Sequence, residues 1–398
     1  MRNSLNQGRH SQRSAMMFII LMGIVSVFAD MTHEGARSVT GPFMALLGAN
    51  ATVVGMVAGF GELVGYLLRL PAGFMADRTG RYWTVTILGY VINMAAVPLL
   101  ALADRWELAA FLIIIERAGK AIRNPARDAM LSHATLDVGR GWGFGLHEAM
   151  DQIGAMLGPL IVAGVLYFKG TYQTSFAILL IPAVLTICVL LAAWRLYPHP
   201  RDLERAAPEL ETKGLSRVYW LYLAAMALTA AGYADFPLIG YHFQKVSTVS
   251  TDWIPVFYAV AMGVDAVAAL IFGRWFDRKG LPVLMVSVFI STFFAPLVFL
   301  GGFYGSLVGM ALWGVGMGAQ ESIMRAAVAG MVSADKRGTA YGIFNTGYGV
   351  FWFLGSALMG IFYDFSVPAL VIFSMVTQSA AVPLLYRVRR ISKLSQGI

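Results

Sequence analysis

Cysteine and charged residues are both scarce in this chain of 398 residues. The single cysteine, Cys188, excludes an intramolecular disulfide and any metal centre built from cysteines. Charged residues make up 13% of the sequence and hydrophobic residues 58%, whereas a soluble domain has about 25% charged residues. The mean hydropathy is +0.67. These values exclude an ordinary soluble domain, and we expect the chain to lie in a lipid bilayer.

Motifs for catalysis and for nucleotide binding are missing as well. No glycine-rich loop is followed by Lys-Ser or Lys-Thr, so the sequence has no phosphate-binding loop for ATP. No serine stands in a nucleophile-elbow pattern, and no His-Glu-x-x-His occurs, although His147-Glu148 begins like one. The sequence therefore predicts a protein that is not an enzyme and that uses no cofactor.

Long apolar segments fill most of the chain. A membrane helix needs roughly 20 apolar residues. Twelve such segments begin near Ala15, Val53, Trp83, Glu107, Trp142, Tyr172, Val218, Trp253, Leu281, Ser306, Thr339 and Val367. The sequence thus predicts an all-α membrane protein with twelve transmembrane helices in two six-helix halves, residues 1–196 and 218–398. The polar stretch 197–217 between them is expected to be a cytoplasmic linker.

Basic residues follow alternate connections. Twenty-two Lys and Arg residues fall on alternate connections and the two ends, whereas the other connections hold only Arg105, Lys169 and Lys245. Because cytoplasmic loops collect positive charge, we expect both termini in the cytoplasm and the protein in the cell (inner) membrane. The pI of about 9.6 is therefore explained by basic residues that set the membrane topology, and we expect no nucleic-acid partner. Met1–Arg13 has no signal-peptide cleavage pattern, so we expect the first segment to remain as a helix.

A short charged motif occurs twice in the chain. Gly73–Arg81 contains Gly, Asp, Arg and Gly in the order and spacing found 200 residues later in Gly273–Gly280. A second motif, Arg140-Gly141, recurs as Arg337-Gly338 at an offset of 197. The chain is therefore predicted to be a duplicated unit. Two halves related by an axis along the membrane normal are a known transporter plan, with the substrate held between them.

The repeated motif resembles the loop signature of the major facilitator superfamily. The resemblance implies twelve helices, transport by alternating access, and docking of Asp77 against the start of another helix in one state of the cycle. The segment Glu116–Asp128, the glycine-containing segment Gly145–Pro159 and the Asp30-x3-Glu34 spacing resemble a bacterial branch of that family. Gly154–Gly164 is similar to a motif of drug and proton antiporters, but Ala163 replaces a usual glycine, so the antiport direction stays open.

Four polar residues of the first segment lie on one helical face. Asp30, His33, Glu34 and Arg37 stand at i, i+3, i+4 and i+7. A charge at the centre of a membrane helix costs about 2.5 to 3.5 kcal/mol on insertion scales, so this face cannot point at lipid. We interpret Asp30 and Glu34 as a proton-binding site in which Arg37 and the cations of the fourth helix set the carboxylate pKa values. A permanently ion-paired structural network is the alternative.

Other polar and aromatic side chains within the segments are candidates for a substrate cavity. They are His33, Glu62, Arg117, Lys120, His147, Glu148, Asp151, Tyr233, Asp235, Glu321, Arg325, Asn345 and Tyr348. The aromatic members favour an amphipathic or aromatic organic solute, although aromatic residues in membrane helices also serve packing and interface anchoring.

Charged residues near the cytoplasmic helix ends are candidates for a gate. They are Asp77, Arg78, Arg81, Arg123, Arg127, Asp128, Arg140, Asp277 and Arg278. We expect the fourth helix to end at Pro125, because the residue before a proline avoids the helical conformation. Its charged neighbours would then form ion pairs with Asp77 or Arg140. Charges that only fix the topology are the alternative.

A metal site is a further alternative. His33, Glu34, His147, Glu148 and Asp151 offer mixed nitrogen and oxygen ligands for a divalent transition metal. Cations on the fourth helix would oppose binding of a metal ion.

Taken together, the sequence predicts a monomeric, proton-coupled secondary transporter that exports a small organic solute by alternating access. A transporter of a divalent transition metal or metal chelate is the alternative, and an uncoupled receptor or scramblase on the same fold is the second alternative.

Overall fold

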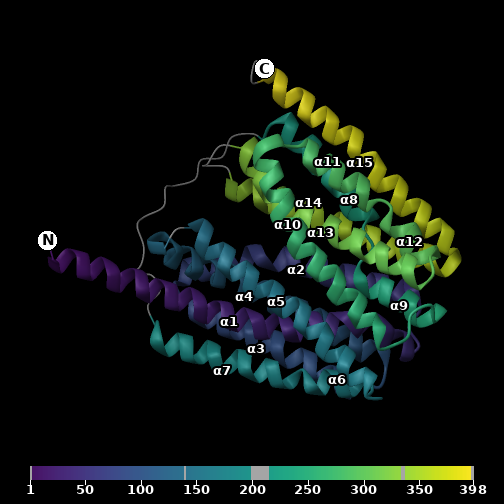
Figure 1. The fold of residues 1–398 in the computed structure, drawn as a ribbon, viewed down its shortest axis with the longest axis horizontal. Coiled ribbons are helices and arrows are strands. Elements are labelled where there is room, and N and C mark those ends of the chain that lie inside the picture. The colour runs from purple at the N-terminus through teal and green to yellow at the C-terminus, as the bar shows by residue number, and fades with distance from the viewer. Residues whose placement is uncertain (1, 139, 199–214, 333–336, 396–398) are drawn as a thin grey trace. The chain divides into compact units, whose positions relative to one another are not determined.

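The computed structural model describes residues 2–138, 140–198, 215–332 and 337–395, and within these ranges the regular structure is helical, without strands (Figure 1). The first half contains α1 (Arg2–Leu46), α2 (Ala51–Thr79), α3 (Tyr82–Leu99), the 3-10 helix η1 (Leu100–Leu102), α4 (Trp106–Val138), α5 (Arg140–Tyr167), α6 (Tyr172–Ile178) and α7 (Leu180–Leu196). The second half contains α8 (Arg217–Gly232), α9 (Phe236–Val246), α10 (Trp253–Lys279), α11 (Pro282–Ser291), α12 (Phe294–Leu300), α13 (Phe303–Met331), α14 (Arg337–Phe365) and α15 (Val367–Ser395).

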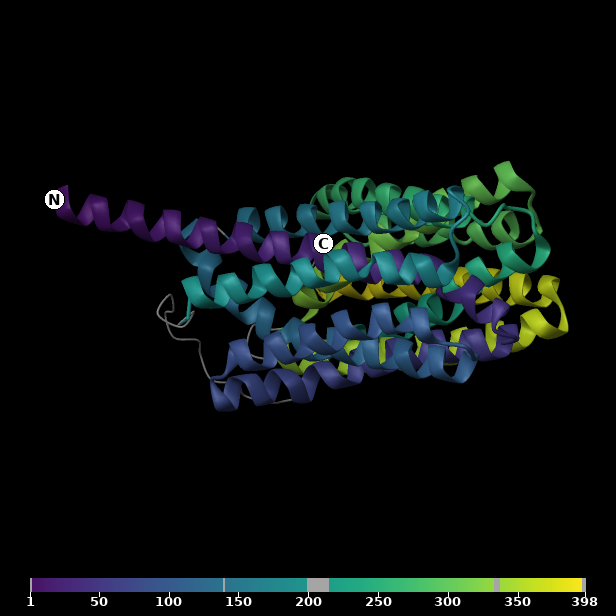
Figure 2. The same ribbon diagram turned by 90° about the horizontal axis from the view of Figure 1, so that it is seen from below.

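These elements form twelve long helical segments in the described residues, because α3 with η1, α6 with α7, α8 with α9, and α11 with α12 each make one segment. Ten of the twelve are long and apolar enough to cross a membrane, and the other two, α4 and α13, carry charged residues within their length. Eleven segments begin within three residues of the predicted start. The exception is α1, which continues back to Arg2 as one helix (Figure 2). The prediction of an all-α protein with twelve membrane helices is confirmed.

Prolines explain three interruptions of these segments. A proline clashes with the carbonyl four residues earlier and cannot donate to it. Pro182, Pro237 and Pro296 stand four or five residues after the last residues of α6, α8 and α11. Despite its interruption, the α6/α7 segment remains aligned end to end (Figures 1 and 2).

Pro125 does not act in this way, and the prediction that it ends the fourth helix is wrong. α4 continues through it to Val138. In membrane helices the carbonyl that a proline frees can be satisfied by neighbouring helices and side chains. Proline alone therefore does not set the boundary of a membrane helix.

By its contacts the chain divides into two units. Unit 1 is Met1–Ala36 with Leu68–Ala207, and unit 2 is Arg37–Leu67 with Pro208–Ile398. The end of α1 and the start of α2 thus pack with the second half of the sequence. The predicted boundaries of the two six-helix halves stay a prediction, and residues 199–214 of the predicted linker lie outside the described residues.

Within unit 2, α14 caps the start of α2. Asp364 accepts hydrogen bonds from the backbone N–H of Ala51 at 3.1 Å and of Thr52 at 2.8 Å, and from the Thr52 hydroxyl at 2.7 Å. A carboxylate at a helix start satisfies donors that have no partner within the helix. Nearby, a side chain at Gly360 would meet the Ala51 carbonyl oxygen at 2.6 Å. Glycine therefore lets the two backbones come close.

Within unit 1, α3 and α4 are in backbone contact. A Cβ atom at Gly89 of α3 would lie 2.6 Å from the amide nitrogen of Arg123, and one at Gly119 of α4 would lie 2.5 Å from that of Asn93. Small residues at such positions are how membrane helices approach closely. This contact holds the polar side chains of α4 at fixed positions beside α3.

Candidate functional site

The polar face of α1 meets α4 inside unit 1. Lys120 of α4 lies between two carboxylates of α1, with its Nζ 3.9 Å from Asp30 Oδ1 and 3.7 Å from Glu34 Oε1. Arg123 approaches the same Asp30 oxygen to 3.9 Å and lies over the ring of Tyr90 at 4.1 Å. We call Asp30, Glu34, Lys120 and Arg123 the carboxylate cluster. These three ion pairs are longer than direct hydrogen bonds, and Lys120 is shared by the two carboxylates.

His33 lies beside this cluster with both ring nitrogens in contact. Its Nδ1 is 2.6 Å from Glu116 Oε1, and its Nε2 is 3.2 Å from Arg117 Nη1. The same Nε2 also lies 3.4 Å from Glu34 Oε1, so His33 links Glu34 of α1 to Glu116 and Arg117 of α4. Asn93 also donates to the Glu116 carboxylate. His33 is therefore held in place by residues of α4, and α3 contributes through Asn93.

The start of α5 is joined to α1 through a second histidine. His147 Nε2 lies 2.9 Å from the Ser26 hydroxyl, and its Nδ1 lies 3.8 Å from Asp151 Oδ2. Further along α5, a Cβ atom at Gly158 would collide with the carbonyl oxygen of Met31 and lie 2.8 Å from the amide nitrogen of Gly35. The glycine at this position therefore lets α5 and α1 approach closely. It holds α5 against the stretch of α1 that carries Asp30 and Glu34.

In unit 2, Arg37 pairs with the start of α9. Its Nη2 donates to Asp235 Oδ1 at 2.7 Å and lies 3.7 Å from Glu62 Oε1. The Asp235 side chain is 1% exposed, and its Oδ1 also accepts from the backbone N–H of Phe236 at 2.9 Å, which caps α9. One carboxylate thus serves an ion pair and a helix cap.

The interruption between α8 and α9 is a feature that sequence reasoning missed. The Gly232 carbonyl accepts from the Ser374 hydroxyl at 2.6 Å and from Gln378 Nε2 at 3.0 Å. The Ala234 carbonyl accepts from Trp313 Nε1 at 2.9 Å. Side chains of α13 and α15 therefore satisfy backbone groups that leave the helix. In the sequence, the interruption is indicated by Asp235, which lies two residues before Pro237 within an apolar stretch.

Predicted aromatic cavity residues come together beside this interruption. The rings of Tyr233 and Trp352 are 5.8 Å apart, and Trp352 and Tyr348 are 5.7 Å apart. The Tyr348 hydroxyl donates to Gln320 Oε1 at 3.0 Å, and sequence reasoning missed this glutamine. Tyr233 and Tyr348 are buried, so in this structure they are packed against their neighbours.

The remaining predicted cavity residues are more scattered. Glu148 and Glu321 are exposed, and Asn345 is half-buried. Arg325 lies on α13, but its side chain is outside the part of the chain that the structure describes.

The two copies of the charged loop have the same backbone geometry. Gly80 and Gly280 have φ values of 67° and 66°, in the region that favours glycine. Each donates to a carbonyl four residues earlier, Ala76 at 2.9 Å and Phe276 at 2.8 Å. The repeat seen in the sequence is thus a structural repeat at the ends of α2 and α10.

The predicted gate residues fall into different environments. Asp77 accepts a hydrogen bond from the hydroxyl of Tyr82, the first residue of α3, at 2.9 Å. Arg123 is 1% exposed and belongs to the carboxylate cluster. Arg127 pairs with Asp128 at 2.9 Å. The exposed members are Asp77, Arg78, Arg81, Asp277 and Arg278. The side chain of Arg140 lies outside the described residues.

The residues of the metal alternative separate into two groups, His33 with Glu34 and His147 with Asp151. Among the described residues, no set of three His, Cys, Asp or Glu side chains is arranged to hold a metal ion.

Comparisons with known proteins agree with this architecture. A family model described as the Major Facilitator Superfamily matches residues 14–356 and 222–395. An uncharacterized protein of Mycobacterium tuberculosis is 39% identical over 383 residues, which is 94% of each chain. The multidrug resistance protein MdtH of Yersinia pestis is 24% identical over 302 residues, covering 72% of this chain and 71% of MdtH.

Among solved structures, the nucleoside transporter NupG matches with a TM-score of 0.73 at 14% identity, over 94% of this chain and 99% of NupG. This likeness shows the fold.

Proposed function

This chain belongs to the major facilitator superfamily, and from that premise we propose that it is a proton-coupled secondary transporter that exports a small organic solute by alternating access. Family membership makes it a multi-pass membrane transport protein and not an enzyme. The bias of basic residues supports cytoplasmic termini, in the cell membrane. We propose that it works as a monomer.

The carboxylate cluster is the observation that carries this proposal. Asp30 and Glu34 face one lysine at 3.9 and 3.7 Å, so neither carboxylate holds it in a direct hydrogen bond. Protonation of one carboxylate leaves Lys120 to the other, and the net charge of the cluster changes by one. Because charge within a membrane is costly, such a change can favour one state of the transport cycle. Arg123, which lies 3.9 Å from Asp30, stabilises the ionised form of Asp30.

The tight contacts of unit 2 complement this loosely paired cluster. Arg37–Leu67 is attached to the second half of the sequence by the Arg37–Asp235 pair and by the Asp364 cap of α2. In the proposed cycle these attachments keep Arg37–Leu67 with the second half of the sequence while the carboxylate cluster exchanges protons. Asp77, Arg78 and Arg81, with Asp277 and Arg278, are the proposed gate at the cytoplasmic helix ends.

The nature of the solute is supported by a relative and by composition. MdtH is named a multidrug resistance protein, which favours export and an organic solute. The aromatic residues around Tyr233 and Tyr348 would offer stacking surfaces to a solute once these packed side chains separate.

A ligand screen tests the proposal. A ligand that binds the folded protein raises its apparent melting temperature, so the purified protein is heated with organic solutes and with divalent metals at two pH values. We expect a stabilising organic solute whose effect changes with pH, and transport of that solute into inverted vesicles driven by an imposed proton gradient. Stabilisation by transition metals alone, lost in His33→Ala or His147→Ala, would overturn the proposal.

A further inference from the structure

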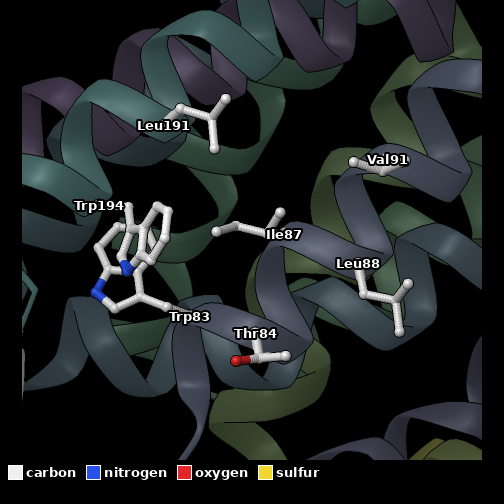
Figure 3. A pocket seen from close by; sticks show the side chains of 7 residues that line it. All are labelled: Trp83, Thr84, Ile87, Leu88, Val91, Leu191 and Trp194. Carbon is white, nitrogen blue, oxygen red and sulfur yellow. The ribbon is translucent and has the colours of Figure 1, made fainter.

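An apolar groove lies on the surface of unit 1 between α3 and α7 (Figure 3). Its volume is about 400 Å³, and its lining includes Trp83, Leu88 and Val91 of α3 and Leu191 and Trp194 of α7. Leu88, Val91 and Trp194 are 50%, 44% and 43% exposed. In a membrane protein such an exposed apolar surface faces lipid. The groove is therefore open to the hydrocarbon part of the bilayer.

The length of the groove suits one leaflet. Its α3 side runs from Trp83 to Val91, which at 1.5 Å per residue is about 12 Å. The hydrocarbon core of a bilayer is about 30 Å thick. The groove therefore spans most of the depth that one acyl chain occupies in a single leaflet.

Positive charge lies at one end of the groove. Trp83 Nε1 donates to the Tyr197 carbonyl at 2.8 Å, so the start of α3 and the end of α7 lie together. Arg81 directly precedes α3, two residues before the groove residue Trp83, and Arg195 of α7 directly follows the groove residue Trp194, so both arginines belong to this end of the groove. Both arginines are exposed.

We propose that this groove binds an anionic phospholipid, with an acyl chain between α3 and α7 and the phosphate near Arg81 and Arg195. Trp194 and Trp83 lie at the same end of the groove as the two arginines, and tryptophan is enriched at membrane interfaces. Under the proposed orientation the basic end faces the cytoplasmic leaflet, where anionic lipids attract basic residues. The positive charge of Arg81 and Arg195 favours an anionic headgroup, and the apolar lining of the groove favours an acyl chain.

Lipid binding to the delipidated protein tests this inference. Native mass spectrometry compares phosphatidylglycerol with phosphatidylcholine of the same acyl chains. We expect phosphatidylglycerol to bind more tightly. Arg195→Gln should lower this preference about fivefold, because each basic residue near an anionic surface contributes on the order of 1 kcal/mol. Arg105→Gln, at the other end of the α3 segment, should leave the preference unchanged.

A second set of variants tests the groove itself. Leu191→Trp fills it and should weaken binding of both lipids, whereas Leu180→Trp, an exposed position at the other end of α7, should not. If Leu191→Trp does not fold, Val91→Trp serves the same purpose on α3. A phospholipid with a photoreactive group in its acyl chain should label α3 and α7. Equal binding of the two lipids by the wild type, an unchanged preference in Arg195→Gln, or labelling confined to other helices would overturn the inference.

Discussion

The polar face of α1 meets its partners in two different ways within two helical turns. Upstream, Asp30 and Glu34 share Lys120 at 3.9 and 3.7 Å, and all three side chains retain some exposure. Downstream, Arg37 donates to Asp235 at 2.7 Å, and that carboxylate also caps α9. A shared, longer ion pair can be rearranged at small cost, whereas a short, buried and doubly used one fixes structure. We therefore assign proton exchange to Asp30 and Glu34. Arg37 and Asp235 attach the end of α1 to the second half of the sequence.

The largest effect is expected from breaking the attachment. Asp235→Ala removes the carboxylate from a buried arginine, which costs about 3 to 5 kcal/mol, and it removes a helix cap worth about 1 kcal/mol. The unfolding free energy of the detergent-solubilised protein measures this loss. Asp252→Ala is the matched control, because Asp252 precedes α10 without a side-chain cap hydrogen bond. A loss in Asp235→Ala no greater than in the control would contradict the attachment role.

A smaller effect is expected where α5 supports the carboxylate stretch of α1. A Cβ atom at Gly158 would collide with the Met31 carbonyl, so Gly158→Ala forces the two helices apart at a cost of about 1 to 3 kcal/mol. Gly164→Ala, on the same helix, meets nothing within 4 Å and should be neutral or slightly stabilising. Thermal unfolding of both variants checks the difference, and equal melting temperatures would show that α5 and α1 are not in close contact there.

The smallest effect on stability is expected from the shared lysine. Lys120→Gln removes a side chain that is 23% exposed and whose ion pairs measure 3.7 and 3.9 Å, so we expect a smaller loss than in Asp235→Ala, where a direct hydrogen bond of 2.7 Å is broken. Proton-driven transport should nevertheless fall strongly. Measuring stability and transport on the same preparation sharpens the comparison. A stability loss as large as that of Asp235→Ala would mean that the carboxylate cluster is a structural network.

Most of the fold follows from the sequence, because the length and hydropathy of a membrane segment depend on local composition alone. The interruption before Pro237 could not be predicted in this way. It depends on whether distant side chains, such as Gln378 and Trp313, are present to satisfy the freed carbonyls. Pro125 shows the converse, since α4 continues through it.

The candidate site was predictable in its charged and aromatic parts. The spacing of Asp30 and Glu34 marks a polar helical face, and the cations of α4 were natural partners for it. Neutral partners such as Asn93, Ser26 and Gln320 do not stand out in a sequence, because amides and hydroxyls are tolerated at many positions of a membrane helix.

The central claim is that Asp30 and Glu34 couple solute movement to protons. Proteoliposomes that contain the transporter and a solute identified by the ligand screen allow two assays, proton-driven accumulation and solute exchange without a gradient. For Asp30→Asn and for Glu34→Gln we predict loss of accumulation with exchange retained, and for the exposed loop control Asp104→Asn we predict wild-type behaviour in both assays. Accumulation at the wild-type rate in both cluster variants would contradict the account.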